Sequence, residues 1–214
     1  MKSISAFSLQ PSALVTPPCY PARPVNGGPL EKALPKSGRW IYGGKYNGWR
    51  AWHHNPTGRL FNRKLEPLSI TAEFAAASAI LRPWPWEWSD VEALERRHQI
   101  GQGTLILLDT LMPGDYDSRR MFQRAAAIDL GIPEHIYAGQ PIAANSVYLP
   151  LVLDYGAELA GWDALQEANC QLGCKPGSPF WEGLVAKRND SIYPRQLRSP
   201  DIEFPCWMKH RWAF

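Results

Sequence analysis

The alternation of apolar and polar positions changes near residue 39, where regular secondary structure is predicted to begin. Residues 1–38 are rich in proline and glycine, as in "TPPCYPARPVNGGP", and show no sustained periodicity. This pattern predicts an irregular N-terminal arm packed on or near the domain. From residue 39 onward, alternating or continuous apolar runs predict one folded domain that extends over residues 39–214.

Within this domain, short runs rich in aromatic and β-branched residues predict strands. These runs lie at 39–46, 49–54, 59–64, 86–94, 103–111, 146–154, 180–188 and 206–212. Helical composition predicts helices at 69–81, with Ser69 or Thr71 as a cap, at 117–131 and at 157–173. The last two end at glycines, as helices commonly do. Strands outnumber helices and follow one another in runs, which predicts an α+β fold with antiparallel sheets flanked by helices.

Length and composition exclude further classes of protein. A chain of 214 residues, 45% of them hydrophobic, suffices for one substantial core. No apolar run approaches the roughly 18 residues that a membrane span requires, and the first residues lack the pattern of a secretory signal. A cytoplasmic protein without a membrane partner is therefore expected. The four cysteines are irregularly spaced, which favours reduced thiols over a disulfide framework, with a zinc site as a minor alternative.

The net charge of +3 conceals an uneven distribution along the chain. Residues 1–64 carry ten lysines or arginines and one acidic residue, a net charge of +9, whereas residues 65–214 carry thirteen and nineteen, a net charge of −6. This asymmetry indicates a polyanionic partner bound by the first part of the chain. The alternative at this point is an uneven but merely solvated surface charge.

Charged residues recur in a specific order along the predicted strands. Lys45 lies in the glycine-bounded stretch "GGKYNGWR", and the later stretches are "FNRK", "DVE", "EGLVAKR" and "WMKHR". Each taken singly fits a solvated strand face. Together they provide the groups needed to bind a nucleoside triphosphate, because the period of two places Lys209 and Arg211 on one strand face, within reach of one phosphate.

These stretches resemble the motifs of the covalent nucleotidyltransferase superfamily, which contains the ATP-dependent DNA and RNA ligases and the capping enzymes. "KYNGWR" is similar to K-x-D-G-x-R, "DVE" to D-G-E, "EGLVAK" to E-G-x-x-x-K and "WMKHR" to W-x-K-x-K, while "LILLD" resembles the strand that packs on the base. The resemblance covers residues from about 40 to the end. It implies two antiparallel β-sheets flanked by helices, with a nucleotide cleft between them.

The chemistry that the resemblance implies is a series of three adenylyl transfers. Lys45 would attack the α-phosphate of ATP, and the AMP would pass from Lys45 to the 5′-phosphate of a nucleic acid strand. A 3′-hydroxyl would then displace it and seal the break. An attacking amine must be neutral, whereas a free lysine has a pKa of about 10.4, so neighbouring cations are expected. The implied cofactors are ATP and Mg²⁺ or Mn²⁺, and the implied partners are strand ends of a nicked or paired duplex, bound by a monomer.

The same resemblance assigns a role to each matching residue. Lys209 and Arg211 would join Lys45 as catalytic cations, and Arg63 would hold the phosphate of the nucleic acid. The nucleotide would contact Lys45, Arg50, Glu92, Leu108, Glu182, Lys187 and Lys209. Glu92 and Glu182 would bind the metal, with Asn47 acting through its water shell, because hard cations prefer oxygen ligands.

The match departs from the family pattern at three places. Asn47 replaces the usual aspartate, Leu108 replaces a frequent aromatic residue, and the match predicts a chain without the C-terminal oligonucleotide-binding (OB) domain of the family. The favoured interpretation is a stand-alone adenylation domain of a ligase for RNA or DNA. Two alternatives stay open: a capping-type guanylyltransferase, and a non-catalytic nucleic-acid-binding module that kept the fold.

Overall fold

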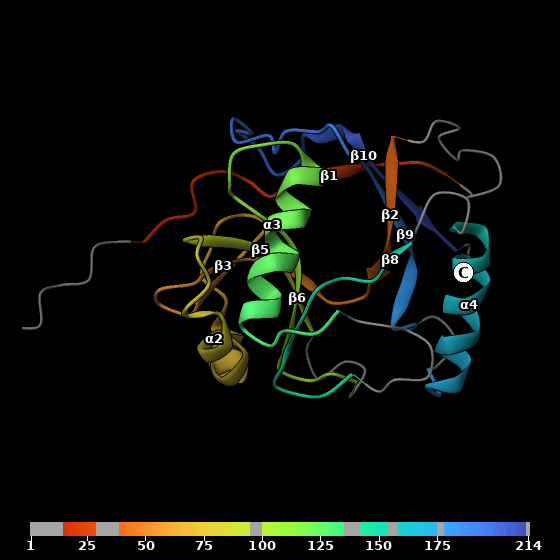
Figure 1. Ribbon diagram of the computed structural model, residues 1–214, viewed down its shortest axis with the longest axis horizontal. Helices are drawn as coiled ribbons and strands as arrows, with labels where there is room; N and C mark the ends of the chain where they lie inside the picture. Colours follow the sequence, from red (N-terminus) through yellow and green to blue (C-terminus); the bar gives the residue numbers. More distant parts are fainter. Residues whose placement is uncertain are drawn as a thin grey trace, which may run out of the picture.

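Ten strands form two five-stranded sheets in the part of the chain that the computed structural model describes, residues 15–28, 39–94, 100–134, 142–153, 158–174 and 178–212 (Figure 1). Sheet A has the order β1 (Arg23–Asn26), β10 (Glu203–Arg211), β9 (Trp181–Arg188), β2 (Trp40–Tyr46) and β8 (Val152–Leu153). Sheet B has the order β4 (Arg59–Asn62), β3 (Trp49–His54), β5 (Trp88–Leu94), β6 (Thr104–Thr110) and β7 (Val147–Tyr148).

The α+β class and the two-sheet architecture are confirmed, but neither sheet is purely antiparallel. β1 runs parallel to β10, and β7 runs parallel to β6. Parallel neighbours require a connection that crosses over the sheet. The two strands of each parallel pair lie far apart in sequence, so no turn motif in the sequence predicts their pairing.

The N-terminal arm is more regular than its composition predicts. Residues 23–26 form β1, although the sequence predicted no regular structure before residue 39. Further contacts anchor the preceding residues, because the Trp52 indole Nε1 donates to the Cys19 carbonyl oxygen at 2.8 Å. Residues 1–14 and 29–38 of the predicted arm lie outside the described residues.

The predicted strand at 146–154 is in fact two short strands that belong to different sheets. β7 pairs with β6 in sheet B, whereas β8 pairs with β2 in sheet A. Pro150 lies between them, and a proline cannot donate a hydrogen bond to a continuous ladder. The chain therefore crosses from one sheet to the other at this point.

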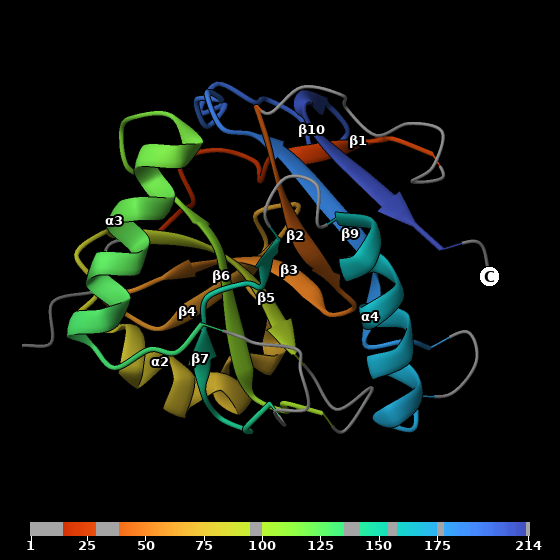
Figure 2. The same cartoon turned by 45° about the vertical axis from the view of Figure 1, so that its right-hand side comes forward.

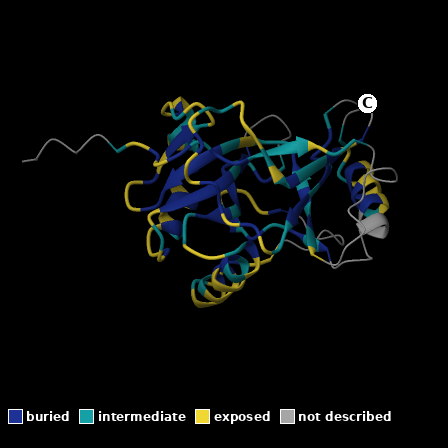
Figure 3. Ribbon diagram, turned by 90° about the horizontal axis from the view of Figure 1, so that it is seen from above, coloured by how far each residue is buried: buried dark blue, intermediate teal, exposed yellow. Residues whose placement is uncertain are grey.

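The helices cover the outer faces of the sheets (Figure 2). They are the 3₁₀ helix η1 (Ser69–Phe74), α2 (Ala75–Leu81), α3 (Tyr116–Asp129) and α4 (Glu158–Gln171). α4 packs through Trp162 and Leu165 on a core shared with β2 and β9. η1 and α2 pack on the core of sheet B, which Ala127 of α3 also joins. The strands are therefore largely buried, whereas the helices expose one face (Figure 3).

The helix boundaries follow the prediction with one exception at the caps. α3 begins after Asp115, whose carboxylate accepts from the Ser118 backbone N–H at 2.8 Å, and Gly131 follows its end with a φ of 66°. Gly173 after α4 has a φ of 68°. The predicted cap at Ser69 or Thr71 was wrong, because η1 has no side-chain cap and Thr71 instead donates to the Leu68 carbonyl.

A third core cluster joins the two sheets at one end of the molecule. It contains buried aromatic side chains from both sheets, among them Trp52 of β3 and Trp207 of β10, together with Tyr193. The Tyr193 ring centroid lies 5.6 Å from that of Trp52 and 5.5 Å from that of Trp207. Aromatic packing of this kind fixes the relative position of the sheets.

Two sequence-based exclusions can be compared with the structure. Within the described residues, no helix combines the length and apolar character that a membrane crossing requires. All four cysteine thiols are free, and the described part of the chain contains no group of three or more histidine, cysteine, aspartate or glutamate side chains that could hold a metal.

Candidate active site

A cleft of about 680 Å³ opens between the two sheets, and its lining is strongly basic. Eight lysine or arginine residues and two glutamates line it among the described residues. The basic residues are Arg23, Lys45, Arg50, Arg63, Lys64, Lys187, Lys209 and Arg211, and the glutamates are Glu92 and Glu182. A site with this charge balance favours a polyanionic ligand such as a nucleotide phosphate.

Lys45 lies near the end of β2, at a point where the strand pairing is irregular. It stands opposite Gly183 of β9, and the register shifts between Lys45 and Tyr46. Such bulges re-aim side chains at the edges of sheets. The Lys45 ammonium donates to Glu182 Oε2, the oxygen that also receives the Arg211 guanidinium at 3.2 Å. One carboxylate oxygen thus holds two cations at the cleft surface.

The turn after Lys45 is fixed by contacts to the segment that enters β9. The Asn47 side-chain Nδ2 donates to the Pro179 carbonyl at 2.9 Å, and the Asn47 backbone N–H donates to the Phe180 carbonyl at 2.9 Å. At Gly48 a Cβ atom would lie 2.7 Å from the Ala93 carbonyl oxygen, so only glycine fits. These contacts hold the loop that carries Lys45 against both sheets.

Glu92 of β5 reaches the same turn from sheet B. Its Oε1 accepts a hydrogen bond from the Gly48 backbone N–H at 2.9 Å. Burial raises the pKa of Glu92 to about 7, although the charges of Lys45 and Arg50 act in the opposite direction. Glu92 is therefore a carboxylate whose ionisation is disfavoured without an additional positive charge.

Arg50 is held in a hydrogen-bond network rather than extended freely into the cleft. Its Nε and one terminal nitrogen donate to the two oxygens of Asp90 at 2.9 and 2.5 Å, and its other terminal nitrogen donates to the Ala22 carbonyl. Asp90 is fully buried and also accepts from the Tyr193 hydroxyl at 2.8 Å. Arg50 thus connects the cleft to the N-terminal segment, in addition to any role toward a nucleotide.

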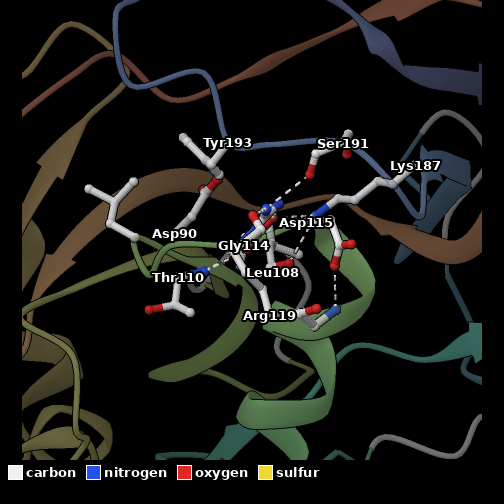
Figure 4. Close-up of polar contacts among 12 residues, drawn as sticks. Asp90, Leu108, Thr110, Gly114, Asp115, Arg119, Lys187, Ser191 and Tyr193 are labelled. Atoms are coloured by element: carbon white, nitrogen blue, oxygen red, sulfur yellow. Dashed lines mark hydrogen bonds and ion pairs between the residues drawn. The ribbon is translucent and has the colours of Figure 1, made fainter.

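A second charged network begins at Lys187 and Leu108, which line the cleft, and continues into the protein (Figure 4). Lys187 of β9 donates to the Leu108 carbonyl at 2.9 Å and lies 3.5 Å from Asp109, and Arg119 of α3 pairs with both Asp109 oxygens at 2.8 and 3.1 Å. Burial lowers the pKa of Lys187 to about 8, although Asp109 raises it. Its ammonium also lies 4.0 Å from the ring centroid of Trp207.

The remaining predicted residues also line the cleft. Leu108 of β6 and Val185 of β9 contribute aliphatic surface from opposite sheets. Lys209 and Arg211 line the cleft from β10, as the period of two predicted, and burial together with Arg23 and Arg211 lowers the pKa of Lys209. Arg63 lines it from the turn after β4.

All ten residues singled out from the sequence therefore line one cleft. They are Lys45, Asn47, Arg50, Arg63, Glu92, Leu108, Glu182, Lys187, Lys209 and Arg211. Sequence reasoning missed Arg23, Tyr116 and the Asp109–Arg119 pair. The pair carried a weak signal, because a basic helix follows the acidic end of a strand. Arg23 carried only its share of the basic charge of residues 1–64, since its segment resembled an irregular arm.

Comparisons with known proteins give structural relatives only. No protein-family model matches the chain, and no curated protein matches it. The ligase domain of M. tuberculosis LigD and the mycobacterial DNA ligase D complexed with ATP and MES each match with a TM-score of 0.55 and 20% identity. They cover 90% of this chain, which spans 59% and 60% of theirs.

A third structure, from a study of DNA binding with a minimal scaffold by Lig E DNA ligases, matches with a TM-score of 0.50 and 12% identity. It covers 90% of this chain, which spans 68% of the Lig E chain. At these identities the likeness shows the fold. The chain has the two-sheet fold of the ligase domains of LigD and mycobacterial DNA ligase D.

Proposed function

We propose that the protein is an ATP-dependent polynucleotide ligase, which joins 5′-phosphate and 3′-hydroxyl ends of RNA or DNA strands through a lysine–AMP intermediate. The observation that carries this proposal is the convergence of six separate sequence motifs on one basic cleft, with Lys45 and Glu182 in contact at its surface. A fold alone would leave the function open, so the proposal rests on the site.

In the first step Lys45 Nζ forms a bond to the α-phosphorus of ATP. The bond from phosphorus to the bridging oxygen breaks, and pyrophosphate leaves with the electron pair. The ammonium must lose one proton to solvent before the attack, and the new nitrogen–phosphorus link loses a second proton afterwards. Lys209 and Arg211 of β10 line the cleft together with Lys45, and Glu182 holds the Lys45 side chain at the cleft surface.

The cations of β10 also act on the phosphate. Lys209 and Arg211 lie on the same strand face and line the cleft together with Lys45. They can donate hydrogen bonds to the α-phosphate oxygens, whose negative charge increases as the phosphorus becomes five-coordinate. Leu108 and Val185, which line the cleft from opposite sheets, would enclose the base between aliphatic surfaces.

The carboxylates fit a metal that arrives with the nucleotide. Magnesium is commonly held by one or two carboxylates and by substrate phosphates, and Glu92 and Glu182 supply two such groups in the cleft. Asn47 keeps its side-chain oxygen available to a water ligand, because its Nδ2 already donates to the Pro179 carbonyl. Bound there, Mg²⁺ or Mn²⁺ would neutralise charge on the nucleotide phosphates.

In the second step an oxygen of the strand's 5′-phosphate attacks the AMP phosphorus, and the bond to Lys45 Nζ breaks. The amine regains its protons from solvent. In the third step the 3′-hydroxyl of the neighbouring strand attacks the activated 5′-phosphate and AMP leaves. Arg63 is the residue assigned to the 5′-phosphate, since it is exposed on the turn after β4 and lines the cleft.

Incubation with ATP labelled at the α-phosphate tests the first two steps. The expected result is a metal-dependent protein–AMP adduct that a 5′-phosphorylated nicked duplex discharges, with sealing of the nick. Arg188→Ala is the control, because Arg188 is paired with Asp190 outside the cleft. Stronger labelling with GTP than with ATP would indicate a guanylyltransferase instead of a ligase. The absence of any adduct would indicate a non-catalytic binding module.

A further inference from the structure

We infer that Arg23 of β1 forms the outer wall of a phosphate subsite that serves two successive ligands. The pyrophosphate part of ATP occupies this subsite in the first step, and the 5′-phosphate of the nucleic acid strand occupies it in the second. The inference rests on the proposed function, and it adds the N-terminal segment to the machinery of the site.

The backbone around Arg23 is held firmly against the cleft. The Ala22 carbonyl accepts from the Arg50 guanidinium, and the Ala22 backbone N–H donates to the Tyr193 hydroxyl at 3.1 Å. Beyond β1, the Gly27 backbone N–H donates to the Lys209 carbonyl at 2.9 Å. Arg23 is thus carried by a strand that is anchored to the same residues that form the cleft.

The Arg23 side chain can exchange its present partners for a phosphate. It lines the cleft, with an exposed fraction of 38%. Its nearest carboxylates are those of Asp201 at 3.6 Å and Glu203 at 3.8 Å, both well exposed, and such surface ion pairs are weak. A phosphate offers a stronger, charge-assisted interaction to a guanidinium. The charge of Arg23 already lowers the pKa of Lys209, so the two cations act in one region.

Cations from the other sheet line the same cleft. Arg63 and Lys64 line it from the turn after β4, while Pro21 and Pro200 border it beside Arg23. The two glutamates that line the cleft are already engaged, Glu92 by the Gly48 N–H and Glu182 by Lys45 and Arg211. An anion in the cleft would therefore meet cations of both sheets, Arg23 from β1 and Arg63 from the turn after β4.

The geometry of displacement at phosphorus explains why one subsite serves two ligands. In the first step pyrophosphate leaves from the side opposite to Lys45 Nζ, because attacking and leaving atoms lie roughly in line. In the second step Lys45 is the leaving group, so the attacking oxygen of the 5′-phosphate must enter from that same side. The position vacated by pyrophosphate is thus the position that the strand phosphate takes.

The variants Arg23→Ala and Arg23→Lys test this subsite, with Arg39→Ala as the control. Arg39 is an exposed arginine paired with Asp190 and does not line the cleft. Three quantities are measured: the KM for ATP, the affinity for AMP, and the rate of AMP transfer from the isolated adduct to a 5′-phosphorylated nick at low strand concentration.

For Arg23→Ala we expect about a tenfold rise in the KM for ATP and about a tenfold slower transfer, with an unchanged affinity for AMP, which lacks the outer phosphates. Arg23→Lys should recover part of both. If Arg23→Ala weakened AMP binding as much as ATP binding, Arg23 would have only a structural role. If the variant changed only adduct formation or only AMP transfer, the two ligands would not share one subsite. The same ATP concentration dependence of adduct formation and the same transfer rate in every variant would overturn this inference, whereas no adduct in the wild-type protein would overturn the proposed function.

Discussion

Asn47 illustrates how a single residue acquires a second role once its surroundings are known. From the sequence, its departure from the usual aspartate concerns only charge and metal binding. In the structure its amide nitrogen also ties the Lys45 loop to the Pro179 carbonyl. An aspartate cannot donate this hydrogen bond, so the residue contributes to the position of the nucleophile as well as to the polarity of the site.

Glu92 should make the stability of the protein depend on pH. Its pKa is raised from 4.5 to about 7 by burial, so the folded state binds more protons than the unfolded state between these values. The associated stability is fully present below about pH 4.5 and is lost as the pH rises through about 7. Replacement by glutamine removes the ionisation and retains an oxygen that can accept from Gly48.

We therefore expect the wild-type protein to lose on the order of 2 kcal/mol more unfolding free energy than Glu92→Gln between about pH 5 and pH 8. Denaturant titrations at both pH values measure this difference. Glu167→Gln, at an exposed position on α4, is the control. Identical pH dependence in wild type and Glu92→Gln would show that burial does not disfavour the Glu92 carboxylate.

At the scale of single elements, the close approach of β9 to β10 explains the glycine after Glu182. Gly183 has a φ of 140°, and a Cβ at this position would lie 2.0 Å from the His210 carbonyl oxygen. Backbone atoms cannot move aside without separating the two strands. β9 carries Glu182 and β10 carries Arg211, so the glycine keeps these two side chains in contact.

Gly183→Ala should destabilise the protein by at least about 2 kcal/mol more than Gly173→Ala. Gly173 also has a positive φ, 68°, but no atom of the described residues lies within 4 Å of its would-be Cβ, so this control isolates backbone strain, about 1 kcal/mol, from the clash. Thermal unfolding of both variants provides the comparison. Equal losses would mean that β9 and β10 adapt to the added methyl group.

The elements also show which parts of the fold the sequence could predict. Strands such as β2, β5 and β9 were predictable because their alternation and composition are local. The division of 146–154 between two sheets and the pairing of β1 with β10 were not, because each depends on contacts with segments distant in sequence. For the same reason the ordered motifs predicted ten cleft residues but omitted Arg23, whose place depends on a parallel pairing about 180 residues away.

At the scale of the whole molecule, many of the basic residues that make the first part of the sequence positive line one cleft. Among the described residues eight cations line it, and five of them lie within the basic first 64 positions: Arg23, Lys45, Arg50, Arg63 and Lys64. From the sequence alone, the uneven charge was compatible with either a polyanionic partner or a solvated surface. The position of these residues around the cleft favours a polyanionic partner.

Nucleic acid affinity should accordingly depend steeply on salt. If three to four phosphates are neutralised, affinity for a nicked duplex should fall about tenfold for each roughly twofold rise in salt concentration. Arg63→Ala should lower the slope of log affinity against log salt by about one, because one phosphate contact is lost. Fluorescence anisotropy over a salt series measures the slope. Binding that is insensitive to salt would rule out phosphate contacts as the main source of affinity.

The central claim is that Lys45 carries AMP during the reaction, and the site of the adduct tests it most directly. The protein is incubated with ATP and Mg²⁺, its intact mass is measured, and the modified peptide is sequenced by tandem mass spectrometry. We predict an increase equal to one AMP residue, located on Lys45, and its absence from a folded Lys45→Ala variant. An adduct that persists in Lys45→Ala, or that maps to another lysine, would contradict the account.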